Sequence, residues 1–544
     1  RDWSSDVCSS DLAPAASGIE AATPSSAAGP AGPALDDLAL APQHLRLTET
    51  ALLDQTDVRN ELRFEREWLL MPNETPLALQ GNVFAVEEPL SGRSLVFLKL
   101  APLPHARPVQ AAADLLVTPS KRTLRVPADR YPVAVLACDG GRAGRTAALQ
   151  AFQRALRPYV PGRDGLFLSN TWGDRNRDSR INEAFLLAEV DAGARLGVDV
   201  VQIDDGWQKG RSANSAAVAK GKGAWNGYWD ADPEFWLPDP VRFPRGLAPV
   251  VAAARAKGLK FGLWFGPDSS GGVTNWQRDA GRILDLHRAD GVDYFKIDSV
   301  KATSTLAEDN LHRFFDRVLA ESAGRVVFDL DVTAETRPGY FGAPRVGPIF
   351  VENRYTDFHR YWPHQTLRSL WSLAHVVDPV RLRIELLNNA RQAEKYPDDP
   401  LAPAKWRPDA LFATAMMASP LGWFEVSNLP AGYVEAVAPL AAAWRRERER
   451  MHGGTILPLG AAPDGVEWTG LASVAPDRRS AYAVVFREFN EDEAWTTAIP
   501  LLAPGAAGVT VLGGRGTAAI RDGRLAVTIP AQLDFLWVRI DPSR

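Results

Sequence analysis

Cysteine is scarce in this chain, and it has neither long hydrophobic runs nor an excess of positive charge. The 544 residues include two cysteines, Cys8 and Cys138, which are too few for a disulfide framework or a cysteine-based metal site. No apolar run reaches the roughly 18 to 20 residues that a membrane span requires. The net charge of −5 argues against nucleic acid as a partner, because phosphate binding needs a concentrated basic surface. The chain is therefore expected to bind neither membrane nor nucleic acid.

Tryptophan, in contrast, is abundant in the middle of the chain. Of the 17 tryptophans, 11 lie between Trp172 and Trp423. Indole rings stack on the apolar faces of sugars and also fill protein cores, so the excess hints at a carbohydrate ligand. The overall composition, 46% hydrophobic and 23% charged, is that of a globular chain long enough for about three domains.

The first 43 residues are set apart from the rest. Residues 1–12 resemble the translation of a sequencing-adapter oligonucleotide and are treated as non-native, which leaves Cys138 alone. Residues 13–43 are Ala, Pro, Ser and Gly with few large apolar residues, and a disordered leader is expected there. The leader and the lack of paired cysteines favour a periplasmic or secreted protein slightly over a cytoplasmic one, and the sequence leaves localisation open.

Short alternating runs predict β domains on both sides of the tryptophan-rich region. Residues 44–160 show a period of two in segments such as 61–65 and 94–100, followed by a helical pattern over 147–159. We expect an N-terminal β-sandwich with a linking helix. Similar runs return over 452–544 and predict a small C-terminal antiparallel β-sandwich.

Between these domains the pattern alternates strand, loop and helix through eight units. Eight such units over residues 161–451 fit a (β/α)8 barrel better than an open doubly wound sheet, and no glycine-rich dinucleotide fingerprint follows the first strand. The fold class predicted is therefore α/β, a central TIM barrel between two β-sandwiches. The predicted strands are 165–170, 198–204, 259–265, 294–298, 325–331, 348–353, 381–387 and 418–425.

The strand over 294–298 ends with Lys296 and Asp298. In a parallel strand buried on both faces, charged residues lie at the ends, so both side chains are expected at the C-terminal mouth of the barrel, pointing the same way. Barrel enzymes carry their active sites there. Asp298 could instead cap the next helix, but a cap would not explain the lysine.

Other predicted strands deliver acids or tryptophans to the same rim. A packed core gains nothing from so many carboxylates, so they indicate a polar ligand held by many hydrogen bonds. The rim residues are Trp172, Asp174, Asp204, Asp205, Trp207, Trp264, Asp268, Lys296, Asp298, Asp329, Asp331, Glu352, Arg354 and Asp357.

Three of these segments together resemble a known family. Residues 202–207 (QIDDGW), 262–265 (GLWF) and 295–298 (FKID) resemble the serial strand motifs of glycoside hydrolase family 36, the α-galactosidase family of clan D. The order of sandwich, barrel and sandwich is similar as well. The resemblance implies a retaining α-glycosidase without metal or cofactor. Such an enzyme uses two carboxyl groups about 5 to 5.5 Å apart.

Carried over residue by residue, the resemblance assigns roles to rim residues. Asp298 matches the nucleophile, and Asp357 matches the acid/base. Asp204 and Asp205 match the pair beside the sugar, and Lys296 matches a lysine that binds sugar hydroxyls and keeps the nucleophile ionised. The further substrate-binding candidates are Trp172, Trp207, Trp264, Asp329, Asp331 and Arg354. Arg354 has two interpretations, pairing with an acidic substrate group or holding the carboxylates in place.

Two segments depart from the family pattern. An acidic residue usually follows the third-strand Trp-Phe, whereas Gly266 stands here and Asp268 comes two residues later. The fifth strand usually runs into a Cys- and Gly-rich segment that holds the 2-hydroxyl of the sugar, whereas here it runs through Asp329 and Asp331. A different 2-substituent is therefore an open alternative.

The resulting hypothesis is a glycosidase that hydrolyses terminal α-linked galactose from oligosaccharides or glycosides with retention. The alternatives on the same scaffold are a galactosyl transferase of the raffinose-synthase type and a glycosidase for another α-sugar, such as N-acetylgalactosamine. A non-catalytic sugar-binding protein is a further alternative. The expected partner is a carbohydrate, and the sequence leaves a homo-oligomer open.

Overall fold

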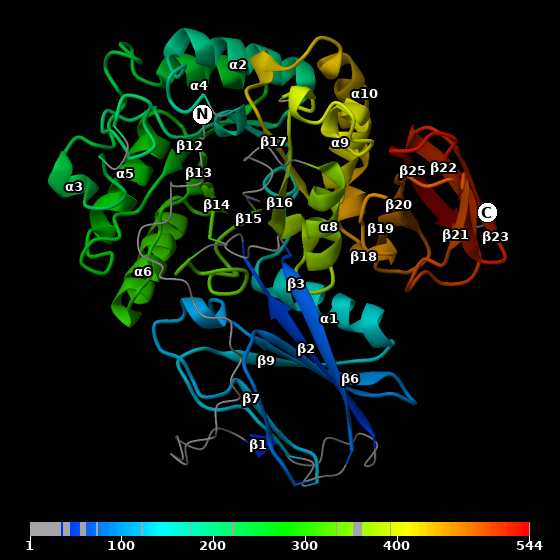
Figure 1. The fold of residues 1–544 in the computed structure, drawn as a ribbon. Coiled ribbons are helices and arrows are strands. Elements are labelled where there is room, and N and C mark those ends of the chain that lie inside the picture. The colour runs from blue at the N-terminus through cyan, green and yellow to red at the C-terminus, as the bar shows by residue number, and fades with distance from the viewer. Residues whose placement is uncertain are drawn as a thin grey trace.

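A closed barrel lies between two β domains. The computed structural model describes residues 34–35, 44–54, 61–71, 74–120, 123–174, 176–219, 222–332, 335–351, 362–391 and 393–542. The N-terminal sheets, blue in Figure 1, lie below the barrel, and the C-terminal sheets, orange to red, lie beside it. The predicted fold class is confirmed.

The barrel consists of eight parallel strands in sequence order, closed by pairing of the last strand with the first. Each predicted strand has its counterpart, shorter by one to three residues at its ends. The barrel strands are β10 Leu168–Asn170, β11 Val200–Ile203, β12 Lys260–Phe265, β13 Tyr294–Ile297, β14 Val327–Leu330, β15 Ile349–Val351, β16 Leu382–Leu386 and β17 Ser419–Trp423.

These strands are buried almost along their whole length, because helices cover the outside of the sheet and side chains fill the inside. The helix after β10 is capped at its start by Asn182, whose side chain accepts a hydrogen bond from Phe185 N, and at its end by Gly197 with φ 91°. The helices of this region are α2 Glu183–Leu196, α3 Tyr228–Ala231, α4 Ala248–Ala256, α5 Trp276–Ala289, α6 Thr305–Glu321, α8 Pro363–Leu373, α9 Pro408–Ala415 and α10 Tyr433–His452.

Two antiparallel sheets form the N-terminal domain. One sheet has the order β3-β2-β5-β6-β9 and the other has the order β1-β8-β7-β4. Ala34–Leu35 forms β1 and pairs with β8, and the rest of residues 1–43 lies outside the described residues. The other strands are β2 Leu45–Leu52, β3 Arg63–Leu70, β4 Leu77–Leu79, β5 Val83–Glu88, β6 Arg93–Lys99, β7 Leu115–Thr118, β8 Thr123–Arg125 and β9 Val133–Cys138.

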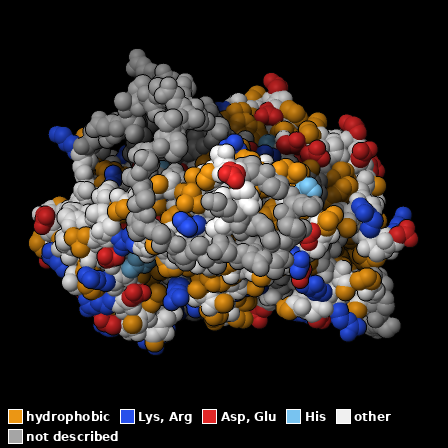
Figure 2. All heavy atoms as spheres, turned by 90° about the horizontal axis from the view of Figure 1, so that it is seen from below, with side chains coloured by type: hydrophobic (Ala, Val, Ile, Leu, Met, Phe, Trp, Pro, Cys, Tyr) orange, Lys and Arg blue, Asp and Glu red, His pale blue; other side chains and the backbone are white. Residues whose placement is uncertain are grey.

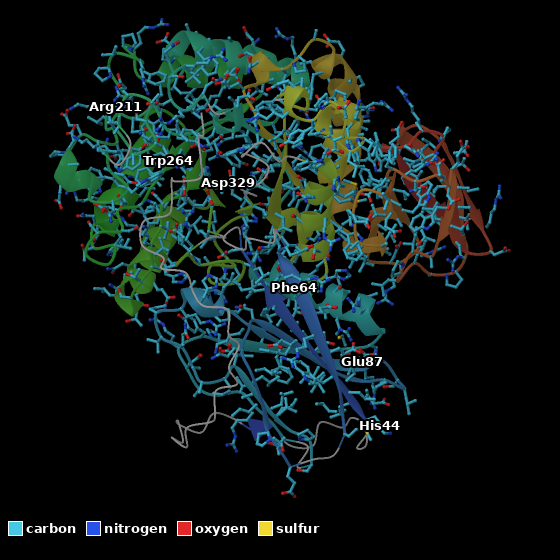
Figure 3. All side chains as sticks on the ribbon, viewed as in Figure 1. His44, Phe64, Glu87, Arg211, Trp264 and Asp329 are labelled. Atoms are coloured by element: carbon cyan, nitrogen blue, oxygen red, sulfur yellow. The ribbon has the colours of Figure 1, made fainter. Side chains whose placement is uncertain are left out.

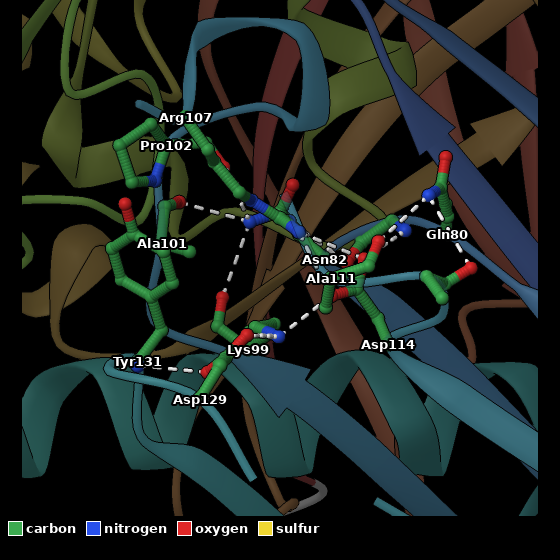
Figure 4. A network of polar contacts seen from close by, with 12 residues as sticks. Gln80, Asn82, Lys99, Ala101, Pro102, Arg107, Ala111, Asp114, Asp129 and Tyr131 are labelled. Carbon is green, nitrogen blue, oxygen red and sulfur yellow. Dashed lines mark hydrogen bonds and ion pairs between the residues drawn. The ribbon is translucent and has the colours of Figure 1, made fainter. Parts of the chain in front are cut away.

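A buried charge network fixes the end of β6 in this domain (Figure 4). Lys99 Nζ lies 2.6 Å from Asp114 Oδ1 and also pairs with Asp129. Arg107 Nη1 donates to both oxygens of Asp114 at 2.8 Å. The side chains of Lys99, Arg107 and Asp114 are at most 3% exposed, so each charge needs its partner. The segment 100–107, which follows β6, is therefore held in one conformation.

The C-terminal domain also has two antiparallel sheets, in the orders β18-β19-β20-β25-β22 and β21-β24-β23. Helix α1, Gly141–Leu156, connects the N-terminal domain to the barrel and also contacts β18. The strands are β18 Thr455–Gly460, β19 Trp468–Val474, β20 Ala481–Arg487, β21 Ala494–Thr497, β22 Ala506–Gly514, β23 Thr517–Arg521, β24 Arg524–Thr528 and β25 Asp534–Pro542.

The N-terminal domain, the barrel and the C-terminal domain share a hydrophobic core. One cluster of buried side chains includes Leu98 and Leu103 of the N-terminal domain, Phe341 of the barrel and Phe486 of the C-terminal domain. On the surface turned toward the viewer in Figure 2, basic and acidic side chains are interspersed. No helix in the described part of the chain is long and apolar enough to cross a membrane.

Candidate active site

The predicted site residues of four neighbouring strands come together at one end of the barrel. Asp204 follows β11, Trp264 lies in β12, Asp298 follows β13 and Asp331 follows β14. Because these parallel strands are adjacent in a closed barrel, their carboxyl ends meet at the same mouth. Trp264 and Asp329 mark this part of the barrel in Figure 3.

Three groups hold the carboxylate of Asp298. Trp264 Nε1 donates to Oδ2 at 3.0 Å, and Arg337 Nη1 donates to Oδ1 at 3.0 Å. The backbone N–H of Ser299 also donates to Oδ1. Ser299 has φ 54°, in the left-handed region that residues other than glycine adopt at a cost, and its hydroxyl lies 2.9 Å from Tyr228 Oη. Helix α6 is capped by Ser304, so Asp298 is not the cap residue.

Asp298 is ionised by its surroundings. Burial alone would raise the pKa of Asp298, but Arg337, Lys296 and the hydrogen bonds from Trp264 and Ser299 outweigh burial and lower the pKa to about 2. The Asp298 side chain is 18% exposed, whereas Asp204 and Asp331 are 4% and 2% exposed. Among these three carboxylates, Asp298 is therefore the one most accessible to a ligand.

Lys296 connects two of the neighbouring acids. Its Nζ lies 3.1 Å from Asp204 Oδ2 and 3.5 Å from Asp331 Oδ2. The same nitrogen lies 4.4 Å from the ring centroid of Phe350 and 4.8 Å from that of Trp423. These aromatic faces also stabilise the buried ammonium.

The two adjacent acids after β11 have different environments. Asp204 Oδ2 accepts from Asn170 Nδ2 at 2.9 Å and from Lys296. Asp205 accepts from Gln208 Nε2 at 2.5 Å and from the hydroxyl of Ser212. Burial is the main cause that raises the pKa of Asp205 to about 7, against these two hydrogen bonds. The sequence predicts a sugar-binding role for the pair, and the carboxylate of Asp204 contacts Lys296 whereas that of Asp205 is held by Gln208 and Ser212.

The tryptophans of the rim are mostly covered. Trp207 is fully buried and donates from Nε1 to Trp264 O at 2.8 Å, and the ring of Trp236 packs against both. Trp229 and Trp236 of the long loop after β11 belong to the hydrophobic core. Trp172 is 7% exposed. Trp207 and Trp236 therefore brace Trp264, and stacking of Trp172 on a sugar stays a prediction.

Asp329 lies deeper in the barrel than Asp298. It is fully buried, pairs with Arg383 through Oδ1 and accepts from Gln202 Nε2 at 3.1 Å through Oδ2. Burial raises its pKa, and Arg383 opposes that effect. Both oxygens are thus engaged by protein groups, and a contact between Asp329 and substrate stays a prediction.

Two predicted site residues, Arg354 and Asp357, lie outside the described residues, together with Glu352. The role of Asp357 as acid/base and its separation from Asp298 therefore stay predictions. Among the residues that the structure describes, no group of three His, Cys, Asp or Glu side chains could hold a metal ion.

Sequence reasoning missed Arg337, which contacts Asp298 at this end of the barrel, and Arg383, which pairs with Asp329 deeper inside it. Arg337 lies in the loop after β14, 39 residues beyond Asp298, and Arg383 lies in β16. Neither belongs to a motif with fixed spacing, so no pattern pointed to them. The only available signal was the excess of acids on the rim, which calls for balancing cations.

Comparison with known proteins adds the family context. No protein-family model matches the sequence. The α-galactosidase of Escherichia coli is 29% identical over 193 residues, 35% of this chain and 24% of that protein. The α-galactosidase Mel36A of Lactobacillus acidophilus is 32% identical over 116 residues, 21% of this chain and 14% of that protein. The chain thus aligns with a quarter or less of the length of these relatives.

Solved structures resemble the chain over nearly all of its length. The GH36 α-galactosidase AgaA of Geobacillus stearothermophilus has a TM-score of 0.64 over 92% of this chain and 75% of its own, at 14% identity. The α-galactosidase of Lactobacillus brevis has a TM-score of 0.64 over 94% of this chain and 75% of its own, also at 14% identity. The chain therefore has the fold of these GH36 α-galactosidases. At this identity the likeness establishes architecture, and the chemistry has to be argued from the site.

Asp268 organises the loop after the third barrel strand. Asp268 is fully buried, and its oxygens accept from Gly227 N at 2.7 Å and from Asn275 Nδ2 at 3.1 Å. Asp268 therefore ties the loop after β12 to the long loop after β11. A Cβ at Gly266 would lie 2.4 Å from Ser299 Oγ, so no side chain fits at that position without movement of Ser299.

Proposed function

We propose that this protein is a retaining α-glycosidase that hydrolyses terminal α-linked galactose by double displacement. The observation that carries the proposal is the state of Asp298. It is an ionised, partly exposed carboxylate at the mouth of a GH36-like barrel, held by Trp264 and Arg337. A nucleophile needs an ionised carboxylate in a fixed orientation, and these contacts supply both.

In the first step, an oxygen of Asp298 forms a bond to the anomeric carbon while the glycosidic C–O bond breaks. The departing oxygen takes a proton from Asp357, which becomes a carboxylate. In the second step, Asp357 takes a proton from water, the water oxygen bonds to the anomeric carbon, and the bond to Asp298 breaks. Two inversions at one carbon give net retention, and both carboxyl groups return to their starting states.

The charges around Asp298 suit this chemistry. The transition state carries positive charge on the sugar ring, and the Asp298 carboxylate stabilises it. Because the pKa of Asp298 is lowered to about 2, the carboxylate is ionised at neutral pH and is a good leaving group in the second step. Asp204 and Lys296, which hold each other at 3.1 Å, are the candidates for binding the sugar hydroxyls.

The names of similar proteins support the sugar class that we propose. Structures of AgaA variants are described in complex with raffinose and with stachyose. Curated relatives from two bacteria that align with this chain are named α-galactosidases. These names support an α-linked galactose as the substrate.

The test is a panel of nitrophenyl α-glycosides with the unchanged protein and with Asp298→Asn. We expect turnover of the α-galactoside, release of the α anomer as first product by NMR, and loss of kcat by about 10⁴-fold or more in Asp298→Asn, because the nucleophile is removed. Asp285→Asn, an exposed acid on α5, is the matched control and should keep the unchanged rate.

Two further measurements complete the test. Azide should restore turnover in Asp357→Ala and produce the α-glycosyl azide, because the small anion replaces the activated water. The partition of product between water and a sugar acceptor separates hydrolysis from transfer. An Asp298→Asn protein with the unchanged rate, or first release of the β anomer, would contradict the proposal.

A further inference from the structure

Arg337 is a cation in direct contact with the carboxylate of Asp298. Its Nη1 donates to Asp298 Oδ1 at 3.0 Å, to Asp331 O at 2.6 Å and to Asp331 Oδ1 at 3.2 Å. The Arg337 side chain is 8% exposed, so these bonds are made with little competition from water. One guanidinium nitrogen thus joins the ends of two adjacent strands, β13 and β14.

Arg337 also belongs to a chain of alternating charges. From β11 to the loop after β14, the chain runs Asp204, Lys296, Asp331, Arg337 and Asp298, with successive separations of 3.1, 3.5, 3.2 and 3.0 Å. Lys296, Asp331 and Arg337 inside the chain each have an opposite charge on both sides, which offsets the cost of their burial. Asp298 ends the chain and is its most exposed member.

The backbone on both sides of Arg337 is fixed. Thr336 O accepts from Ala302 N at 2.9 Å, and Gly339 N donates to Val332 O at 2.8 Å. Gly339 has φ 63°, and a Cβ there would lie 3.5 Å from Leu103 N, in the segment held by the Lys99 network. Tyr340 Oη donates to Leu53 O at 2.7 Å. The N-terminal domain therefore packs against the loop that carries Arg337.

We propose that Arg337 is a positioning residue that fixes the orientation and charge of Asp298 for attack on the sugar. Arg337 and the Ser299 N–H both hold Oδ1, while Trp264 holds Oδ2. Donors on both oxygens prevent rotation of the carboxylate about its Cβ–Cγ bond. This inference rests on the proposed function, because it assigns a role toward the nucleophile of that reaction.

The electrostatics support the geometry. Arg337, Lys296 and Tyr228 interact electrostatically with Asp298, and Asp331 and Asp204 lie beside the two cations. Burial tends to raise the pKa of Asp298, and Arg337 is the largest of the influences that lower it, ahead of Lys296. Removal of Arg337 therefore raises the pKa of Asp298, and the protein loses the active ionised form at low pH.

The test compares Arg337→Met, which removes the charge at similar length, with Arg337→Lys, which retains it. For Arg337→Met we expect kcat to fall about 100-fold with a smaller change in KM, and the acidic limb of the kcat/KM profile to move up by about one to two pH units. Arg337→Lys should recover part of kcat, and the acidic limb of its kcat/KM profile should lie close to that of the wild-type protein. Arg345→Met, an exposed arginine of the same loop, is the matched control and should leave the profile unchanged.

Three results separate this inference from the proposed function. A normal acidic limb in Arg337→Met overturns the role of Arg337 and leaves the glycosidase proposal standing. A protein that turns over no α-galactoside overturns the proposed function. The contact between Arg337 and Asp298 is then measured by urea unfolding. In that case Arg337→Met should lower the urea concentration at the midpoint of unfolding more in the protein that retains Asp298 than in the Asp298→Asn variant. Equal losses in the two backgrounds would overturn the inference.

Discussion

Single aspartates in this barrel differ in chemistry because their neighbours differ. Asp298, with two cations nearby, has a pKa of about 2, whereas Asp205, with a second acid beside it and only neutral donors, has a pKa of about 7. Burial acts in the same direction on both, so the neighbouring charges decide the outcome. The same residue type is thus ionised at Asp298 and keeps its proton up to about neutral pH at Asp205.

Asp205 makes the stability depend on pH. The folded state binds a proton at Asp205 more tightly than the unfolded chain does, so this stabilisation is complete below about pH 4 and is lost as the pH rises through about 7. Asp205→Asn removes the dependence. From pH 5 to pH 8, we expect the wild-type protein to lose about 2 kcal/mol of unfolding free energy relative to Asp205→Asn.

Urea unfolding at the two pH values measures this difference. Asp230→Asn, an exposed acid in α3, should show no such shift. A difference that is independent of pH would mean that Asp205 is ionised in the folded state at pH 5, contrary to its environment of neutral donors.

Among the elements, the loop after β11 depends most on backbone conformation. Gly206 follows the two acids with φ 120°, and a Cβ there would lie 2.4 Å from the Asp178 Cβ and 3.2 Å from its Cα. Its carbonyl accepts from Arg242 Nη1. The turn that presents Asp204, Asp205 and Trp207 to the barrel mouth therefore requires glycine.

Gly206→Ala is expected to cost about 3 kcal/mol of unfolding free energy, because strain of the backbone adds to a clash with the chain around Asp178. Gly227→Ala is the control, because Gly227 also has a positive φ. It has φ 66° but open space around the added Cβ, so it should cost about 1 kcal/mol. Chemical denaturation compares the two variants, and equal losses would show that the clash with Asp178 does not matter.

At the scale of the whole molecule, helix α1 joins the three parts. Gln150 Nε2 donates to Ile456 O in β18 at 2.6 Å, and Gln150 Oε1 accepts from Ile456 N at 3.0 Å. Gln153 Nε2 donates to Val376 O at 2.9 Å, beyond the end of α8. One helix face therefore connects the N-terminal domain, the barrel and the C-terminal domain through buried amides.

Gln150→Leu should cost about 2–4 kcal/mol of unfolding free energy, because it leaves the N–H and C=O of buried Ile456 without their partner. Gln277→Leu, at an exposed position in α5, is the control and should change stability little. Tryptophan fluorescence during urea unfolding measures both variants. A loss in Gln150→Leu no larger than that of the control would mean that the C-terminal domain is not held through this contact.

The sequence by itself determined the architecture and the acids of the rim. Eight alternating units predicted the barrel strands to within three residues, because buried parallel strands need continuous apolar runs and helices need a period near 3.6. Lys296 and Asp298 were placed at the barrel mouth by the alternation of side chains along one strand. These are local properties, and the residues that determine them are adjacent in the chain.

Only the tertiary structure decided which charges hold one another. Arg337 reaches Asp298 from a loop 39 residues away, Arg383 reaches Asp329 across 54 residues, and Lys296 lies between Asp204 and Asp331. Closing the barrel brings these groups within 2.5 to 3.5 Å, and electrostatic interactions depend on that separation and on burial rather than on spacing along the chain. The sequence therefore identified the acids. The fold placed Arg337 and Lys296 near Asp298, and these cations make Asp298 the candidate nucleophile.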